Sequence, residues 1–555
     1  MEQSTRVILV IAAALLILGL VMAPFFAGPA DDGDDTDAVF VAASDSSAAA
    51  KAQARYVCDG VDDHVEIRQA LAALSGSGGT VRLAKGTYTC AGNLEPGANT
   101  VLEGAGPEET TLEFPKTGGL RAYRPSVTFK GFTVTGVADL LITESHARVT
   151  DVTMTVDNSR VGAFYVWAAN TVIEDIVFEN CRAIDCGRYG FLNSGEGSPR
   201  LVKDIKYVGC AAINCGRDSY VSTGPWVTGF DIVEKNDIDG AEVIGCYAEG
   251  NQESGFHLEG FSYLSIKNVR FQDCVSVNNA QKGKDEATFG GGYTVSKGVT
   301  FENCTSENNK HGFLINGGSS VRGHDVSYLR CTDTGSDYGF TVDHGSGFVL
   351  EDCEALGSKL RSLTIDRSHD ILVEAFTSRP AADGAGTAPA GSGADDRHEV
   401  LIQDSFGVVL SGDITTSRPH GLSVAGTEAR NITVQDTCIL SDGSRGSIFG
   451  VYVSGDVADA GTILVRNSKI AALAENSPLK AGIENLASQA VLVENVLVTG
   501  AGEPFVNCDV LAEAEVPSPT PTRQPGPDTL VAMIGLGVAV IGLAVAIFLL
   551  WRRRR

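Results

Sequence analysis

The segments VRFQDCVSVNN (Val269 to Asn279) and VTFENCTSENN (Val299 to Asn309) decide the fold, because they are two copies of one pattern. In each copy, apolar residues alternate with variable ones up to a cysteine, and a small residue follows two positions later. Alternation with a period of two indicates a β-strand with one buried face. The cysteine recurs at intervals of 22 to 36 residues, as Cys181, Cys210, Cys246, Cys274, Cys304, Cys331 and Cys353.

Aligning the copies on this cysteine shows further columns. Five residues after it, Asn251, Asn279 and Asn309 align, and stacked Asn amides can hydrogen-bond from one turn of a solenoid to the next. A second strand that begins with Gly-Phe or a similar pair then follows. Three residues before the cysteine stands an apolar or aromatic column, which consists of Phe178, Tyr207, Val243, Phe271, Phe301, Tyr328 and Leu350.

Fixed strands joined by connections of variable length are typical of a solenoid, because insertions enter the turns without disturbing the stacked core. The Leu-x-x-Leu-x-Leu framework of leucine-rich repeats is missing, and no unit of four strands suggests a propeller blade. The sequence therefore predicts an all-β protein, a right-handed parallel β-helix.

The start of the domain fits this prediction. DGVDDHVEIRQALAAL (Asp59 to Leu74) offers Asp62 or Asp63 as the cap of a short amphipathic helix, which would cover the open end of the solenoid. With GGTVRLAKGTY (Gly78 to Tyr88), it resembles the cap and first coil of the pectate-lyase-like superfamily. The repeats are most similar to its carbohydrate-binding and sugar-hydrolase β-helices. This fold carries lyases, hydrolases, epimerases and binding modules, so the resemblance implies no single activity.

The resemblance covers residues 56–506, with an insertion loop at 380–396. Residues 1–30 have the order of a signal peptide, or of an uncleaved N-terminal anchor, and 31–55 form an acidic, Ala-rich linker. After the β-helix we expect a Pro/Thr-rich stalk at 507–529, a transmembrane helix at 530–551 and a cytoplasmic basic tail at 552–555. The body would then lie outside the cell, anchored to its membrane, although cleavage at either terminal segment stays open.

The formal net charge of −26 argues against a nucleic-acid partner, because the protein's field repels phosphate. An anionic polysaccharide would need a bridging cation such as calcium. Most of the thirteen cysteines fall in the repeat column, which predicts stacked buried thiols rather than metal ligands. Cys58 and Cys90 bracket the first structural unit and are the pair predicted for a disulfide.

Chemistry is predicted where the aligned Gly-Phe strands gather acidic residues. Equivalent positions on neighbouring coils lie about 4.8 Å apart, so Asp231 and His257 should be neighbours. Glu234 and Glu259 stand further along the same ridge. Asp231 with Glu259 is the preferred catalytic pair, and His257 would hold one of them or carry a proton. The alternative is that these residues are simply a solvated acidic face.

Residues around this ridge suggest binding. An insertion places Tyr220 and Trp226 directly before Asp231, and aromatic faces suit sugar rings. A second patch, with Asp343 near Asp366, is the reserve site. Calcium is the one cofactor that the sequence suggests, since FDIVEKNDID supplies oxygen ligands, although a solvated turn explains the same residues. The candidate calcium ligands are Asp231, Glu234, Asp237 and Asp239.

Two functions follow from these features. The tether and stalk favour a cell-surface module that binds a polysaccharide or surface glycan, or that forms part of the cell envelope. The alternative is a polysaccharide-processing enzyme, a glycoside hydrolase rather than a lyase. The arginine motif of the lyases is missing, and β-elimination would leave only Lys235 or Arg367 as nearby bases. The paired aspartates of the pectin hydrolases are missing too.

Overall fold

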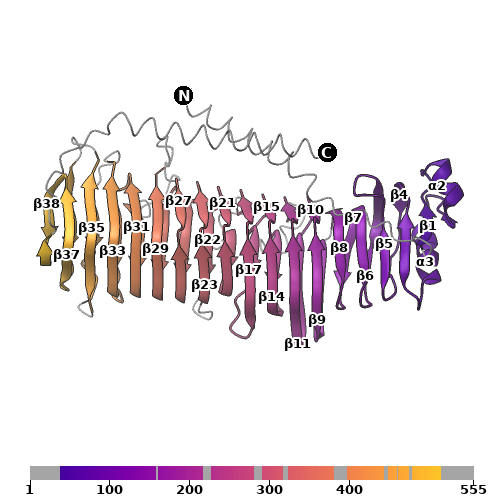
Figure 1. The fold of residues 1–555 in the computed structure, drawn as a ribbon, viewed down its shortest axis with the longest axis horizontal. Helices are drawn as coiled ribbons and strands as arrows, with labels where there is room; N and C mark the ends of the chain where they lie inside the picture. The colour runs from indigo at the N-terminus through magenta and orange to yellow at the C-terminus, as the bar shows by residue number, and fades with distance from the viewer. Residues whose placement is uncertain are drawn as a thin grey trace, which may run out of the picture.

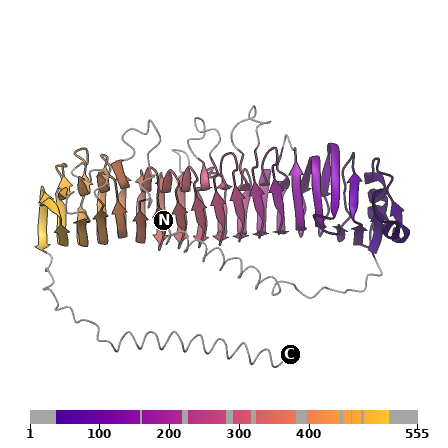
Figure 2. The ribbon, with the colours of Figure 1, turned by 90° about the horizontal axis from the view of Figure 1, so that it is seen from above.

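The computed structural model describes residues 38–157, 161–216, 227–280, 290–316, 323–380, 397–442, 448–458, 461–473 and 478–513. Their strands pair in parallel and form one continuous coiled sheet. Figure 1 shows the strands side by side along a single long axis, and Figure 2 shows the same rod turned by 90°. The predicted parallel β-helix is confirmed.

Three stacks of strands run along this axis. The first stack contains the Gly-Phe strands: β13 (Phe230–Val233), β16 (Phe256–Leu258), β19 (Gly291–Val295), β22 (His311–Asn316), β25 (Tyr338–Asp343), β28 (Arg361–Asp366), β30 (His398–Gln403), β32 (His420–Ala425), β34 (Phe449–Val453), β36 (Leu479–Asn485) and β38 (Ala501–Val506). The second stack contains strands that, from β14 to β26, precede the cysteines of the column: β1 (Ala38–Ala42), β2 (Tyr56–Val57), β3 (Gly79–Leu83), β5 (Thr100–Glu103), β14 (Asp237–Ile244), β17 (Ile266–Gln272), β20 (Lys297–Glu302), β23 (Gly323–Leu329), β26 (Gly345–Glu351) and β39 (Cys508–Glu513).

The third stack contains short strands, which from β10 onward follow the cysteines of the column: β4 (Gly86–Thr89), β10 (Arg182–Ile184), β12 (Ala211–Ile213), β15 (Tyr247–Glu249), β18 (Val275–Val277), β21 (Thr305–Glu307), β24 (Thr332–Thr334) and β27 (Glu354–Leu356). Longer strands bend through a corner and belong to more than one stack: β6 (Thr110–Ala122), β7 (Thr128–Ile142), β8 (Arg148–Val156), β9 (Phe164–Glu179), β11 (Phe191–Val208), β29 (His369–Arg379), β31 (Phe406–Thr416), β33 (Arg430–Ser441), β35 (Ile463–Ala472) and β37 (Val491–Thr499).

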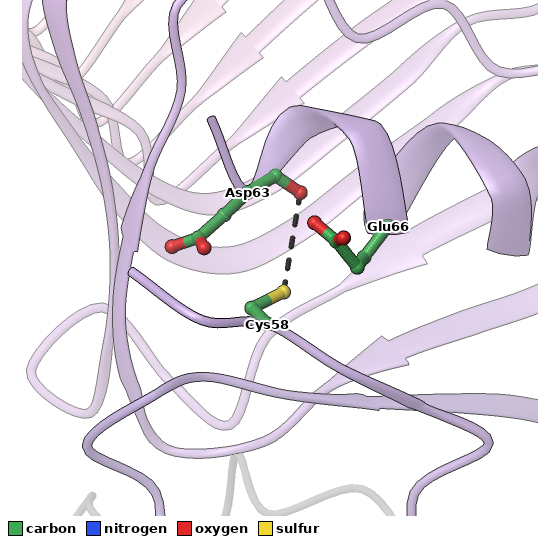
Figure 3. Close-up of side chains that lie close together, drawn as sticks. All are labelled: Cys58, Asp63 and Glu66. Carbon is green, nitrogen blue, oxygen red and sulfur yellow. Dashed lines mark hydrogen bonds between the residues drawn. The ribbon is translucent and has the colours of Figure 1, made fainter. Parts of the chain in front are cut away.

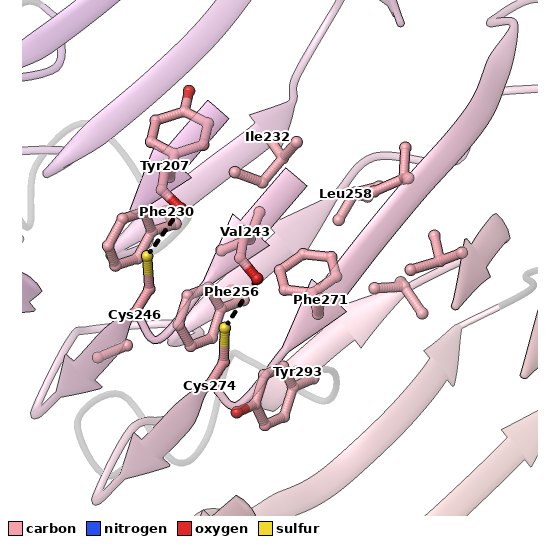
Figure 4. Close-up of a cluster of buried hydrophobic side chains, with 14 of the residues drawn as sticks. Tyr207, Phe230, Ile232, Val243, Cys246, Phe256, Leu258, Phe271, Cys274 and Tyr293 are labelled. Carbon is pink, nitrogen blue, oxygen red and sulfur yellow. Dashed lines mark hydrogen bonds between the residues drawn. The ribbon is translucent and has the colours of Figure 1, made fainter. Parts of the chain in front are cut away.

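The predicted columns point into the core. Phe271 and Phe301 are fully buried, and their rings stack with centroids 4.8 Å apart. Phe256, from the Gly-Phe stack, meets Phe271 edge to face at 5.7 Å (Figure 4). Aromatic pairs in these two geometries are favourable beyond the area that they bury. Where both columns are aromatic, neighbouring coils therefore pack on each other through rings from two of the three stacks.

The cysteine and asparagine columns hold successive coils together. The thiol of Cys246 donates to the carbonyl of Tyr207, and that of Cys274 to the carbonyl of Val243, at 3.5 and 3.2 Å (Figure 4). Asn251 donates through Nδ2 to Oδ1 of Asn279 at 2.9 Å. These side chains are buried, so the bonds satisfy polar groups that water cannot reach.

The N-terminal end is capped as predicted. Helix α3 (His64–Ala73) begins after Asp63 and buries its apolar side against the first coil. In α2 (Ala48–Gln53), the N-cap residue Ser47 accepts a hydrogen bond from the N–H of Ala50. The predicted disulfide is wrong, because Cys58 and Cys90 are both free thiols. The Cys58 thiol points instead at the carbonyl of Asp63, 3.9 Å away (Figure 3).

Cys58, Asp63 and Glu66 are the one group of potential ligands in the described part of the chain whose ligand atoms lie within 4.8 Å of one another (Figure 3). The two carboxylate oxygens of Asp63 already accept N–H groups from Gly60 and Thr89, each at 2.8 Å. Burial also raises the pKa of the Cys58 thiol, which disfavours the thiolate that a metal would need. Asp63 therefore ties the turn before α3 to β4, and the group does not suit a metal site.

Both ends of the β-helix extend beyond the predicted boundaries. Strand β1 lies within the expected linker 31–55 and pairs with β3, which buries Val39 and Val41. Strand β39 lies within the expected stalk and pairs with β37. No helix in the described ranges has the length and apolarity to cross a bilayer. The predicted terminal segments, 1–30 and 530–551, lie outside those ranges.

Candidate functional site

The predicted neighbours Asp231 and His257 do face each other across adjacent coils. Asp231 on β13 is in register with His257 on β16, and Phe230 and Phe256 beside them turn inward. Because side chains alternate along a strand, Asp231 and His257 point outward from the coil. The alignment of the Gly-Phe strands thus predicted this contact correctly.

A β-bulge shifts the acidic ridge by one residue. After Asp231 pairs with His257, Val233 pairs with Leu258, so β13 has one residue more than β16 at this point. The N–H of Glu259 then donates to the carbonyl of Val233 at 2.6 Å. The bulge therefore brings Glu234 level with Glu259 at the end of the two strands.

These residues line a cavity of about 380 Å³, which lies in the size range of ligand sites. Asp231 and His257 form its floor. One wall consists of residues that precede the strands β11 and β16, namely Arg188, Tyr189 and Glu253. The opposite wall consists of residues that follow β13 and β16, because the ends of parallel strands lie on the same side of the stack. The wall at the strand ends consists of Glu234, Lys235, Glu259 and Phe261.

The floor is buried, and two of its polar atoms form an ion pair but no hydrogen bond. The Asp231 side chain is 2% exposed, and its Oδ1 lies 3.4 Å from Nδ1 of His257. Neither atom makes a hydrogen bond to the described residues, and the same holds for Glu234 Oε2 and Glu253 Oε1. Buried polar atoms without partners are uncommon in folded proteins and call for an explanation. Here they converge on one cavity.

The site also shifts proton affinities. Burial lowers the pKa of His257, but Asp231, with help from Glu253 and Glu259, outweighs burial and raises it to about 10. Burial, together with Asp231 and Glu259, raises the pKa of Glu253 to about 7, against the influence of His257. Near neutral pH the cavity therefore holds an imidazolium and a carboxyl group that is partly protonated.

Glu234 also titrates higher than an ordinary glutamate. Burial and the nearby Asp231 raise the pKa of Glu234, while Lys235, whose Nζ is 3.5 Å from its Oε1, acts in the opposite direction. Two of the carboxyl groups in the cavity thus have an increased tendency to hold a proton.

The alignment of the repeats does not identify Glu253, which is only 3% exposed. It lies two residues before Gly255, where the aligned strand begins, and therefore does not belong to the column that contains Asp231 and His257. An alignment extended back to the turn would have placed Glu253 next to them. Arg188, Tyr189 and Phe261 were missed for the same reason, because they lie in turns outside the aligned strands.

Other predicted site residues lie elsewhere. Tyr220 and Trp226 are outside the described residues. Asp237 accepts a hydrogen bond from the N–H of Ser265, and Asp239 accepts one from Nδ2 of Asn268, both at 2.7 Å. Both residues are on β14 and neither lines the cavity, so of the four proposed calcium ligands only Asp231 and Glu234 come together there.

The reserve site is occupied by an ion-pair cluster. Asp343 and Asp366 are in register on β25 and β28, as predicted. Arg367 bridges them at 2.9 and 2.8 Å, and His344 lies 2.7 Å from Asp343. Burial raises the pKa of Asp366, whereas Arg367 lowers it. Because Arg367 already pairs with both carboxylates, this patch is less suited to bind a ligand than the cavity at Asp231.

Comparison with known proteins finds no matching family profile and no similar curated sequence. Solved structures with a similar coil include the A-module of a mannuronan C-5 epimerase from Azotobacter vinelandii, with 14% identity, a TM-score of 0.38 and coverage of 82% of this chain and 96% of that one. For a surface adhesin of Streptococcus pneumoniae the identity is 12% and the TM-score 0.36, with coverage of 67% and 89%. The strand pairing itself shows that the chain is a parallel β-helix protein.

Proposed function

We propose that the cavity around Asp231 hydrolyses a glycan. The observation that carries this proposal is the convergence of unpartnered buried atoms from Asp231, Glu253 and His257 on one cavity. Sugar binding alone does not require a carboxyl group whose pKa is raised to about 7, whereas a general acid that works near neutral pH does. The structure thus supports the enzyme over the binding module that the terminal segments favoured.

In glycoside hydrolysis, a carboxylic acid protonates the glycosidic oxygen while a second carboxylate activates water or attacks the anomeric carbon. Glu253, with its pKa near 7, is the acid. Asp231 is the second carboxylate, and the His257 imidazolium beside it stabilises its charge. Water finally adds a hydroxyl group to the anomeric carbon and a proton to the catalytic residues, which restores Glu253.

The test is to incubate the purified protein with neutral polysaccharides and with polyuronates, with and without calcium. We expect new reducing ends and no unsaturated uronate, because hydrolysis by Glu253 and Asp231 requires no elimination. Binding without turnover would reject the hydrolase and favour the glycan-binding module. If the protein neither binds nor cleaves any of these glycans, a structural role in the cell envelope is the remaining hypothesis.

We further propose that the β-helix is held at the cell surface by the apolar segment 530–551, with the four arginines at 552–555 inside. Protease added to intact cells is then expected to remove the β-helix and its activity together. Mass spectrometry of the mature termini would show which terminal segments remain. Full protection of the β-helix from protease would reject this topology.

A further inference from the structure

The loop from Gly260 to Ser265, which follows β16, is fixed in place beside the cavity. The ammonium group of Lys297 donates to the carbonyls of Phe261 and Leu264, at 3.3 and 2.8 Å. Lys297 is only 7% exposed, and burial lowers its pKa. At the far end, the N–H of Ser265 donates to Asp237. A buried cation thus fixes a short surface loop.

This loop presents two aromatic rings to solvent. Phe261 is 36% exposed and Tyr263 is 58% exposed, and their rings stack with centroids 5.3 Å apart and planes 7° from parallel. The guanidinium of Arg200 lies over the Tyr263 ring at 5.0 Å. Phe261 also lines the cavity. An ordered aromatic pair that remains exposed at the edge of a cavity is typical of a binding surface.

We infer that Phe261 is the platform for an uncharged sugar ring, backed by Tyr263 and Arg200, in the cavity where Glu253 acts. This inference rests on the proposed function and names its substrate class. Stacking on an aromatic face uses the C–H surface of a pyranose. Because the loop is already ordered, the protein loses little conformational entropy when the sugar binds.

The polar atoms of the cavity support an uncharged sugar over a uronate. Glu234 Oε2 and Glu253 Oε1 are acceptors without a hydrogen-bond donor among the described residues, and Asp231 Oδ1 has only its ion pair with His257. Sugar hydroxyl groups supply donors to such atoms. The cavity also holds three cationic side chains, Arg188, Lys235 and His257, but its four carboxyl groups outnumber them. A uronate would add a further carboxylate to this acidic site, in a protein with a formal net charge of −26. Neutral polysaccharides are therefore the best match.

The test measures binding to the full-length Glu253→Gln protein by calorimetry, so that turnover does not interfere. The probes are cellohexaose, laminarihexaose, maltohexaose and hexagalacturonate. We expect at least one neutral hexaose to bind, and the additional change Phe261→Ala to weaken it about tenfold, the loss of one stacking contact. Phe261→Tyr should preserve the affinity, and Tyr123→Ala, at an aromatic residue 38% exposed elsewhere, should leave it unchanged.

Three results would overturn the inference: no neutral hexaose binds, only hexagalacturonate binds, or Phe261→Ala binds as tightly as its parent. These outcomes are separate from those of the proposed function. Phe261-dependent binding without any turnover by the unmodified protein would reject the hydrolase but keep the sugar platform. Turnover that Phe261→Ala leaves unchanged would keep the hydrolase but reject the sugar platform.

Discussion

Glu253→Gln is expected to lower kcat on the glycan that the protein cleaves by a factor of about 10² to 10⁴, the usual contribution of a general acid. Glutamine has nearly the same shape as the protonated acid but cannot give up a proton. Glu253 is also buried with an unpartnered Oε1, so the amide should fit without loss of stability. Steady-state kinetics and thermal unfolding of the same samples would check both statements.

The pH profile separates a catalytic role of Glu253 from a structural one. The pKa of Glu253 is about 7, so activity should fall as the pH rises through that value, because the acid loses its proton. Residual activity of Glu253→Gln should lack this alkaline limb. Glu307→Gln, at an exposed glutamate, should behave like the parent. A kcat within twofold of the parent would remove Glu253 from the mechanism.

Asp333→Ser is expected to stabilise the protein at pH 8 by up to about 4 kcal/mol, the equivalent of a pKa shift of about three units. Asp333 stands in the column of small core residues, where the neighbouring coil has Ser306. Its side chain is 0% exposed, and its Oδ2 has no partner among the described residues. Burial raises the pKa of Asp333 from 3.8 to about 7.

The sign follows from proton linkage. The folded protein binds the Asp333 proton more tightly than the unfolded chain, so this stability is complete below pH 3.8 and is lost as the pH rises to about 7. Urea denaturation at pH 5 and pH 8 should therefore show a larger benefit of Asp333→Ser at pH 8. Asp413→Ser, at an exposed aspartate, is the control. An equal effect of Asp333→Ser at both pH values would contradict a buried titrating carboxyl group.

The coil could be predicted in detail because a solenoid repeats its core. Columns such as Phe271 with Phe301 follow from the cysteine spacing, and the same register placed Asp231 beside His257. Insertions change only the turns, so they do not disturb this correspondence between sequence and space.

The site could be predicted only in part, because a turn has no column to align. Glu253 and Phe261 lie in turns, and the bulge that brings Glu234 level with Glu259 adds one residue that the strand period does not contain. The disulfide prediction failed because it used only sequence positions, whereas the orientation of the Cys58 thiol depends on how α3 docks. The cavity is identified by buried polar atoms without hydrogen-bond partners, and these follow from how the folded chain packs rather than from the sequence pattern.

The thiol column has a consequence for how the rod comes apart. Thiols such as Cys210 and Cys246 are buried and donate to the coil before them, and burial raises the pKa of both. An alkylating reagent needs an exposed thiolate, so it can modify a cysteine only after that coil has detached. Because the cysteines are spread along the rod, the order in which they are alkylated would record the direction in which the protein unravels.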